Sequence, residues 1–320
     1  MLEKPMDVLT VFPLRKTKRQ KQAFRDAVQA YAASIGYESR VEKGSFGSQN
    51  LILGNPEQAD YLVTAHYDTC ARLPIPNFLT PCNFWLFLLW QLALMLLILG
   101  VCILGGLAVG LLTGSGSAGV WVGYLLVWIL LALMLIGPAN PSNANDNTSG
   151  VITLLEIAKS MPENQRKRVC FVLFDLEEAG LIGSASYRKA HKARTDRQMV
   201  LNLDCVGDGD NLLLFPTKKL KKDAGKMDTL RAGCGSFGAK SMRLRESGFS
   251  VYPSDQANFP YGVGIAAFRR CKWVGLYCGR IHTHRDTILE EENVNLLRGQ
   301  ILKIVCGAAK SERKMENESL

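Results

Sequence analysis

The chain has 320 residues, a net charge of +9 and a hydrophobic content of 48%. Its nine cysteines are odd in number and form no C-x-x-C pair, which argues against a zinc knuckle, a redox motif or a disulfide framework. Outside one long apolar insert, about 260 residues remain, enough for a single α/β domain with a substantial core.

The first segment, residues 1–10, mixes charges and proline, and no apolar run follows it, so we expect no signal peptide. A basic run without acids then comprises Arg15, Lys16, Lys18, Arg19, Lys21 and Arg25. Such runs occur in nucleic-acid-binding segments, but beside a membrane insert contact with anionic lipid headgroups fits better, and a solvated helix face fits equally well. We therefore expect no nucleic-acid partner. Apolar residues at helical spacing predict an amphipathic helix over Gln20–Ile35.

Short apolar runs that end at polar residues predict buried strands. The runs are 51–53, 61–65, 169–174, 199–203 and 262–268, and helical spacing predicts a helix over 151–161. Strands that alternate with helices predict an α/β fold with a mixed, mostly parallel central sheet flanked by helices. Open sheets of this kind build their sites at the carboxyl ends of strands.

A long stretch without any charged residue separates Arg72 from Asp146. Within it, Phe84–Leu112 and Val120–Ile136 reach the ~20 apolar residues, roughly 17–25, that a helix needs to cross a bilayer. Tryptophans stand towards the ends of both segments, as in an aromatic belt. The alternative is a pair of buried core helices, but soluble domains rarely contain so long an uncharged stretch. We predict a two-helix transmembrane hairpin over 82–137 that interrupts one domain made of 1–81 and 138–320.

The orientation of this hairpin follows from its flanks. The connector Thr113–Ala118 is short and uncharged, whereas both flanking arms carry Lys and Arg. A hairpin leaves both arms on one side, and the positive-inside rule places that side in the cytoplasm. Scattered cysteines that look like free thiols agree with this. We expect a two-pass integral membrane protein of a bacterial inner membrane with its domain in the cytoplasm, and the oligomeric state stays open.

Imidazole and carboxylate side chains stand at the predicted strand ends. The set suits zinc or a similar divalent ion and comprises His66, Asp146, Glu178, Asp204 and His282. Five ligands, one able to bridge, suit two ions ~3.5–4 Å apart that polarise a carbonyl and activate water. Glu177 could serve as general base if burial raised its pKa, and Asp68 could fix the tautomer of His66. Each residue alone would fit an ordinary turn or cap, so the ordered combination carries the prediction.

These motifs together resemble the M28 family of zinc metallopeptidases. The matching segments are AHYDT (65–69), NDNTSGV (145–151), FDLEEAGLIGS (174–184), NLDCVG (202–207), SDQANF (254–259) and HTHRDT (282–287). The resemblance covers residues ~50–305 apart from the hairpin. It implies a zinc-exopeptidase, phosphorylase/hydrolase-like fold, two Zn²⁺ per chain and a peptide substrate.

The resemblance also assigns roles to individual residues. Asp146 would bridge the ions, one held also by His66 and Asp204, the other by Glu178 and His282. Glu177 would be the general base and Asp68 the orienting acid. The family's last histidine precedes T-x-x-D-T, which selects His282 over His284. Asp255 matches a position near the substrate pocket, although the histidine that often follows it there is replaced by Gln256.

An aminopeptidase that removes N-terminal residues is the activity that these features favour. A glutaminyl cyclase, which resembles a one-zinc version of the site, and an amidohydrolase for N-acyl amino acids or lipids remain open on the same fold. Retention of all five ligand-type residues favours hydrolysis. A catalytically silent membrane scaffold is the alternative from another class. The hairpin replaces a short loop beside the site, so it is either a plain anchor or a device that turns the site towards the bilayer.

Overall fold

The computed structural model describes residues 2–318, and side chains are described for residues 2–307. A ten-stranded sheet has the order β1-β2-β4-β3-β5-β9-β6-β8-β7, and β10 pairs with β9. The strands are β1 Ser39–Lys43, β2 Gln49–Leu53, β3 Tyr61–His66, β4 Val169–Phe174, β5 Met199–Leu203, β6 Asn211–Pro216, β7 Gly235–Phe237, β8 Lys240–Leu244, β9 Gly262–Cys271 and β10 Gly275–Tyr277. The neighbours β4, β3, β5 and β9 run parallel, so the predicted mixed sheet with a parallel centre is confirmed.

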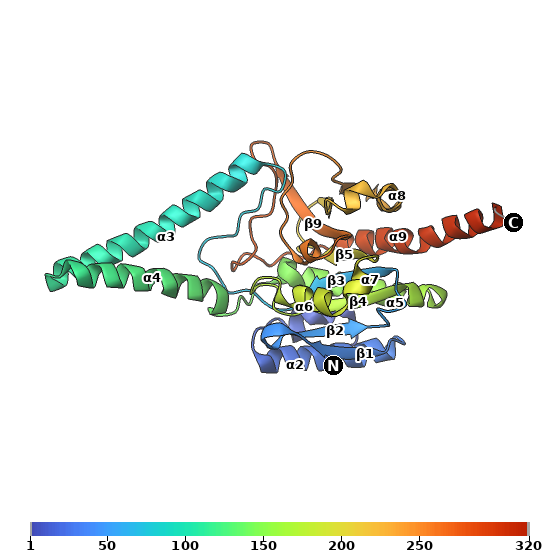
Figure 1. The fold of residues 1–320 in the computed structure, drawn as a ribbon, viewed down its shortest axis with the longest axis horizontal. Coiled ribbons are helices and arrows are strands. Elements are labelled where there is room, and N and C mark those ends of the chain that lie inside the picture. The colour runs from blue at the N-terminus through green and yellow to red at the C-terminus, as the bar shows by residue number, and fades with distance from the viewer. Residues whose placement is uncertain (1, 319–320) are drawn as a thin grey trace.

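Helices cover both faces of this sheet (Figure 1). The α-helices are α1 Val8–Val11, α2 Lys18–Ser34, α3 Phe84–Thr113, α4 Gly116–Ile136, α5 Gly150–Ser160, α6 Ile182–Ala190, α7 Lys192–Thr195, α8 Ala224–Gly233 and α9 Glu291–Glu318. Short helical segments of other types are η1 Pro5–Asp7, η2 Ser45–Gly47, η3 Ala144–Ser149, η4 Glu163–Arg168, η5 Leu220–Lys222 and η6 Asp255–Asn258. The helices predicted over 20–35 and 151–161 correspond to α2 and α5.

The central strands are buried along their whole length because both of their faces are covered. Every residue of β3, β4 and β5 is buried, which explains their continuous apolar sequences. On one face, residues of α2, α5 and α9 share a core cluster with alternate strand residues. On the other face, Tyr187 of α6 and Phe259 pack against the remaining ones.

Part of the basic run lies inside the protein. Arg15, Lys21 and Arg25 are no more than 7% exposed. Arg15 donates to the Tyr67 carbonyl (2.6 Å), Lys21 to the Asp175 carboxylate and Arg25 to the Tyr67 hydroxyl (2.8 Å). The interpretation of the whole run as lipid-contacting or solvated is therefore wrong for these three residues. Their side chains are hydrogen-bonded within the domain, and Lys21 forms an ion pair with Asp175 at the end of β4.

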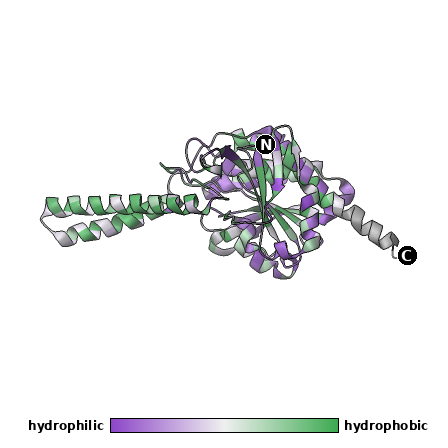
Figure 2. Ribbon diagram, turned by 90° about the horizontal axis from the view of Figure 1, so that it is seen from above, coloured by the Kyte–Doolittle hydropathy of each residue, from purple (hydrophilic) through white to green (hydrophobic). Residues whose placement is uncertain are grey.

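Helices α3 and α4 leave the domain as a paired hairpin (Figures 1 and 2). Both are long and apolar enough to cross a membrane by length and composition, and only 11% and 6% of their most apolar windows are buried. A Cβ atom at Gly106 would lie 2.6 Å from the Gly119 carbonyl oxygen, and one at Gly119 equally close to the Gly106 oxygen. The two backbones therefore touch through glycine, as in small-residue helix packing.

The two arms of the hairpin meet again where they join the domain. Ala71 and Ala139 form an isolated antiparallel bridge, and the Arg72 amide donates to the Pro138 carbonyl at 2.8 Å. The chain thus leaves β3, forms the hairpin and returns to the same place before η3 and α5. This point lies at the end of the sheet where the predicted site residues are found.

Candidate metal centre

The carboxyl ends of three parallel strands bring the predicted site residues together. His66 is the last residue of β3 and pairs with Phe174, the last residue of β4. Glu177 and Glu178 follow β4 directly, and Asp204 follows β5, the other neighbour of β3. Because parallel strands end at one edge of a sheet, residues far apart in the sequence gather here.

Asp146 lies at the centre of this group. Its Oδ1 is 3.3 Å from His66 Nε2, and its Oδ2 is 3.0 Å from His282 Nε2. The same nitrogen of His66 lies 3.6 Å from Asp204 Oδ1, and that of His282 lies 3.6 Å from Glu178 Oε2. The two carboxylate oxygens of Asp146 therefore face two different histidines, each of which has a second carboxylate beside it.

Several of these atoms form sets compact enough to hold a cation. Ligand atoms within 4.8 Å of one another occur in four groups: His66, Glu177 and Asp204; His66, Asp146 and Glu178; Asp146, Asp204 and Cys205; and Cys70, Glu178 and His282. Among the described residues, Glu178 Oε1 and Asp204 Oδ1 are buried without a hydrogen-bond partner. Buried carboxylate oxygens without a donor are costly, so these two atoms fit a site that takes up cations.

The turn after β4 holds Glu177 and Glu178 by their backbone. The Asp68 carboxylate accepts hydrogen bonds from the amides of Glu177 (3.1 Å) and Glu178 (3.3 Å). Asp68 Oδ1 also lies 3.5 Å from His66 Nδ1, which is long for a hydrogen bond. Asp68 therefore fixes the position of both glutamates at least as directly as it orients His66.

Burial and charge shift the proton affinities of these groups. Burial, helped by the charges of Glu178, Asp255 and Asp204, raises the pKa of Glu177 well above its usual value. Burial, with the charge of Asp146 as a further cause, raises the pKa of Glu178 to about 8. Burial would lower the pKa of His282, but the charge of Glu178 and the contact with Asp146 together raise it to about 10. The centre thus gathers several carboxyl groups and two imidazoles in a small buried volume.

Two residues that the sequence analysis assigned no role support the centre. The Asp286 carboxylate accepts from the amides of Asn145 and Asp146, each at 3.0 Å. The Asn147 side chain donates to the Leu203 carbonyl (2.9 Å) and accepts from the Cys205 amide (3.2 Å), and so joins the Asp146 segment to the end of β5. Both residues stand inside motifs already quoted, HTHRDT and NDNTSGV, which is the signal that could have identified them.

Of the remaining predicted positions, some belong to this cluster and others do not. His282 belongs to the cluster, with a left-handed backbone (φ 64°), whereas His284 is exposed. Asp255 is fully buried, and burial, with the charges of Asp68 and Asp204 as further causes, raises its pKa to about 7. Gln256 donates to the Tyr252 carbonyl and accepts from Asn202, so its side chain is used within the fold.

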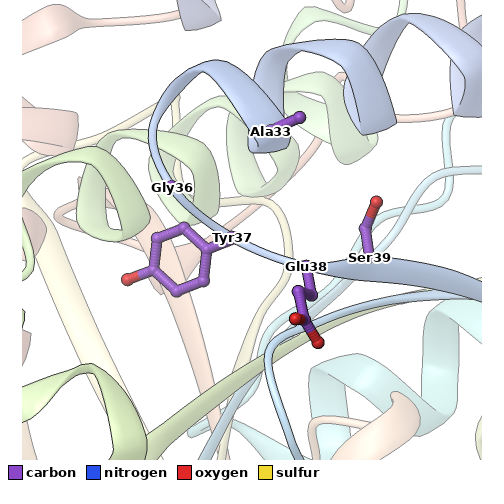
Figure 3. Close-up of a pocket in the computed structure, with 5 residues that line it drawn as sticks. All are labelled: Ala33, Gly36, Tyr37, Glu38 and Ser39. Atoms are coloured by element: carbon purple, nitrogen blue, oxygen red, sulfur yellow. The ribbon is translucent and has the colours of Figure 1, made fainter.

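A separate hollow lies at the opposite end of the sheet (Figure 3). It is lined by Ala33, Gly36, Tyr37, Glu38 and Ser39, where α2 passes into β1. Ser39 pairs with Leu53 at the end of β2 that is remote from the metal-type cluster. The hollow offers a single carboxylate and no imidazole or thiol, so it is not the chemical centre.

Comparison with known proteins agrees with this arrangement. The sequence pattern of Peptidase family M28 matches residues 133–298. The fold is similar to that of a glutaminyl cyclase from Porphyromonas gingivalis, at 16% identity and a TM-score of 0.58, over 95% of this chain and 96% of that one. It is also similar to a Zn-dependent exopeptidase from Parabacteroides distasonis (13%, 0.58, 94% of each chain) and to the LapA aminopeptidase of Legionella pneumophila (14%, 0.53, 95% and 68%). Comparison with curated protein sequences gave no match.

Proposed function

Since this chain belongs to peptidase family M28, we propose that it is a membrane-anchored, dinuclear zinc aminopeptidase. The observation that carries the proposal is the position of Asp146 between His66 and His282, each with a further carboxylate beside it. One bridging carboxylate flanked by two imidazole-carboxylate pairs is the donor set expected for two neighbouring divalent ions.

The residues present fit a pair of zinc ions. Asp146 would bridge them, with His66 and Asp204 holding one ion and Glu178 and His282 the other. The buried Glu178 and Asp204 oxygens that lack a donor would gain a positive partner in this way. When bound, such ions supply Lewis-acid polarisation of the scissile carbonyl and lower the pKa of a water molecule.

The protein's own part in hydrolysis is proton transfer and positioning. Glu177 would take the proton from the attacking water and donate it to the leaving amine, and its raised pKa suits a group that must hold a proton between these steps. Asp68 would keep Glu177 in place through the hydrogen bond that it accepts from the Glu177 amide. Asp255, buried near Glu177, would lie beside the substrate's end.

Glutaminyl cyclisation is the second candidate, since the P. gingivalis enzyme shares the fold along almost the whole of both chains. A cyclase would need Glu177 to move a proton without delivering water. The complete set of five ligand-type residues around Asp146 favours the hydrolytic alternative. An amidohydrolase for N-acyl amino acids or lipids would use the same centre and differ in its substrate pocket.

Membrane anchoring is the second part of the proposal. Residues 82–137 would form a transmembrane hairpin, and 1–81 and 138–320 would be the two parts of one metallopeptidase domain. The exposed apolar surfaces of α3 and α4 and their glycine contacts support this. Lys and Arg on both arms support a cytoplasmic domain at a bacterial inner membrane.

The test is metal content together with turnover. The full chain, purified in detergent, is expected to contain two zinc ions and to hydrolyse a subset of aminoacyl fluorogenic substrates. Glu177→Gln should keep the zinc and lose turnover by at least about 100-fold, whereas Glu163→Gln, at an exposed helical turn, should change neither. One zinc with cyclisation of Gln peptides would establish the cyclase, and an absence of metal would leave the scaffold.

A further inference from the structure

Among the side chains that the structure describes, four large aromatic ones outside the hairpin are exposed to solvent. Trp273 is 86% exposed and Phe46 89%, and the other two are Phe237 (65%) and Phe249 (46%). All four stand in or beside connections between secondary-structure elements. Single exposed apolar side chains are ordinary on a protein surface, but several aromatic ones gathered at one end beside an apolar hairpin match the aromatic residues found at membrane interfaces.

The strand register places two of these residues at the metal-site end of the sheet. Phe46 lies just before β2, where the Gln49 amide donates to the Asp175 carboxylate at the end of β4. Trp273 follows β9, which runs parallel to β5 and extends beyond the pair formed by Leu203 and Ile265. Phe46 therefore lies near the carboxyl end of β4, and Trp273 follows the carboxyl end of β9.

The other two aromatic residues lie at the same end. The ring of Phe249 is 4.7 Å from that of Phe84, the first residue of α3. Phe237 pairs with Lys240 at the start of β8, and this position is level with the far end of β9, because β6 pairs with both strands there. The hairpin leaves the domain from this same end (Figure 1).

Helix lengths indicate how deep this end of the domain would lie. At ~1.5 Å per residue, the 21 residues of α4 span ~31 Å, about the ~30 Å of a hydrocarbon core, whereas the 30 residues of α3 span ~45 Å. The helices are joined at the outer tip, so the surplus turns of α3 lie beside the domain. Phe78 touches Trp90 in these turns (5.5 Å) and Tyr277 of β10 (5.7 Å). With the hairpin across a bilayer, the rim of the domain would be level with the headgroup layer.

Cationic side chains accompany the aromatic ones. Lys16 donates to the Leu135 carbonyl in the last turn of α4 (3.1 Å), and Arg245 donates to the Phe249 carbonyl (3.5 Å). Lys272 lies over the Trp273 ring at 5.6 Å, and Arg270 and Lys43 are exposed nearby in the sequence. Paired aromatic and cationic groups match the chemistry of an anionic lipid surface.

We propose that the metal-site end of the domain lies against an anionic bilayer, with its exposed aromatic residues, among them Phe46, Phe249 and Trp273, in the headgroup layer. This inference rests on the proposed membrane anchoring. It deepens the proposed function, because a centre at this end receives peptides whose amino termini are held at the membrane surface. The substrate class would therefore be peptides that remain associated with the membrane.

The test is hydrogen exchange of the full chain in three environments: detergent micelles, phosphatidylcholine nanodiscs, and nanodiscs that also contain phosphatidylglycerol. Amides of segments 44–48, 247–250 and 271–276 should exchange several-fold more slowly in the anionic nanodiscs than in micelles. Segment 54–60, at the opposite end of the sheet, should exchange equally in all three. High salt should reduce the protection by screening the charges.

A triple variant, Phe46→Ser, Phe249→Ser and Trp273→Ser, should lose the protection of these segments while α3 and α4 remain protected. Val41→Ser, which removes an exposed apolar side chain from the middle of β1, should behave like the wild type. If α3 and α4 of the wild type exchanged slowly in the nanodiscs while segments 44–48, 247–250 and 271–276 exchanged as in micelles, the surface contact would be overturned. The anchoring would stand.

A chain that does not enter nanodiscs would contradict the anchoring instead. Sedimentation of the wild-type chain with phosphatidylglycerol vesicles would then decide the surface contact by itself. Binding that the triple variant loses would support the contact, and no binding would overturn it.

Discussion

The backbone amide of Leu73 donates a 2.7 Å hydrogen bond to the carbonyl oxygen of His282. After the hairpin, the Asn140 side chain donates to the carbonyl of Thr283 at 2.9 Å, and the backbone amide of Asn140 donates to the Cys70 carbonyl at 3.0 Å. The chain segments on both sides of the hairpin are therefore hydrogen-bonded to the loop that carries His282, a proposed zinc ligand. The apolar hairpin and the proposed metal centre are thus connected by hydrogen bonds.

Removing the Asn140 contact should weaken the ion held by His282. Asn140→Ala leaves the buried Thr283 carbonyl without this donor, a loss of about 1–3 kcal/mol, and zinc affinity should fall by about tenfold or more. Chelator competition monitored by zinc release would measure it. Asn164→Ala, at an exposed helical turn, is the control and should leave the affinity unchanged. Equal zinc affinities in the two variants would show that the Asn140–Thr283 hydrogen bond does not support the centre.

Asp286 should matter for metal binding without touching the metal. The Asp286 carboxylate now accepts one hydrogen bond from each of two backbone amides, those of Asn145 and Asp146. In Asp286→Asn, an NH2 group would face one of these donors, so the segment that carries Asp146 should shift. We expect zinc affinity to fall by about 10- to 100-fold, as is usual for groups that orient a ligand. Titration calorimetry would measure this, with circular dichroism to verify the fold. Asp228→Asn, at a position with a side chain 70% exposed, should bind zinc like the wild type.

The buried pair of Lys21 and Asp175 should contribute strongly to stability. Lys21→Met would leave a carboxylate that is 4% exposed without its partner, and the free energy of unfolding should fall by about 3–5 kcal/mol. Denaturant unfolding in detergent would measure the change. Arg231→Met removes two exposed ion pairs, with Asp228 and Glu246, and should lower the free energy of unfolding far less. Similar losses in the two variants would contradict a special role for the buried pair.

The hairpin should tolerate a larger side chain at Gly100 but not at Gly106. Gly106→Val places a side chain against the Gly119 carbonyl, which should force α3 and α4 apart and cost about 1–3 kcal/mol. Gly100→Val adds the same side chain where nothing lies within 4 Å, so it controls for helix propensity and hydrophobicity. Thermal unfolding in detergent would compare the two. A larger effect at Gly100 than at Gly106 would contradict the packing.

Much of the fold could be predicted from apolar runs that end at polar residues. The runs at 61–65, 169–174 and 199–203 became β3, β4 and β5, because strands buried on both faces need continuous apolar sequence. Strand β6 was missed although its sequence is a buried apolar run, and so was β8, of which the first three residues are buried. Strands β1, β7 and β10 were not predicted either. They are short and largely exposed edge or hairpin strands, so their burial leaves no strong pattern in the sequence.

The proposed site residues were selected by motif, whereas their supporting contacts depend on tertiary structure. Charged residues such as Arg15 and Lys21 were assigned to the surface because composition alone favours exposure for Lys and Arg. Their burial depends on acceptors more than fifty residues away, namely the Tyr67 carbonyl and the Asp175 carboxylate. A local sequence pattern cannot predict contacts between residues so far apart in the chain.

The position of the hairpin within the chain constrains the order of assembly. Strand β3 is synthesised before the hairpin, yet its two neighbours in the sheet, β4 and β5, come after it. A chain that crosses the bilayer twice and returns at Ala139, opposite Ala71, brings these strands to the same side with little loss of loop entropy. If α4 failed to cross back, β3 and its partners would be separated by the membrane. On the proposed topology, completion of the catalytic domain therefore waits for correct insertion of its hairpin.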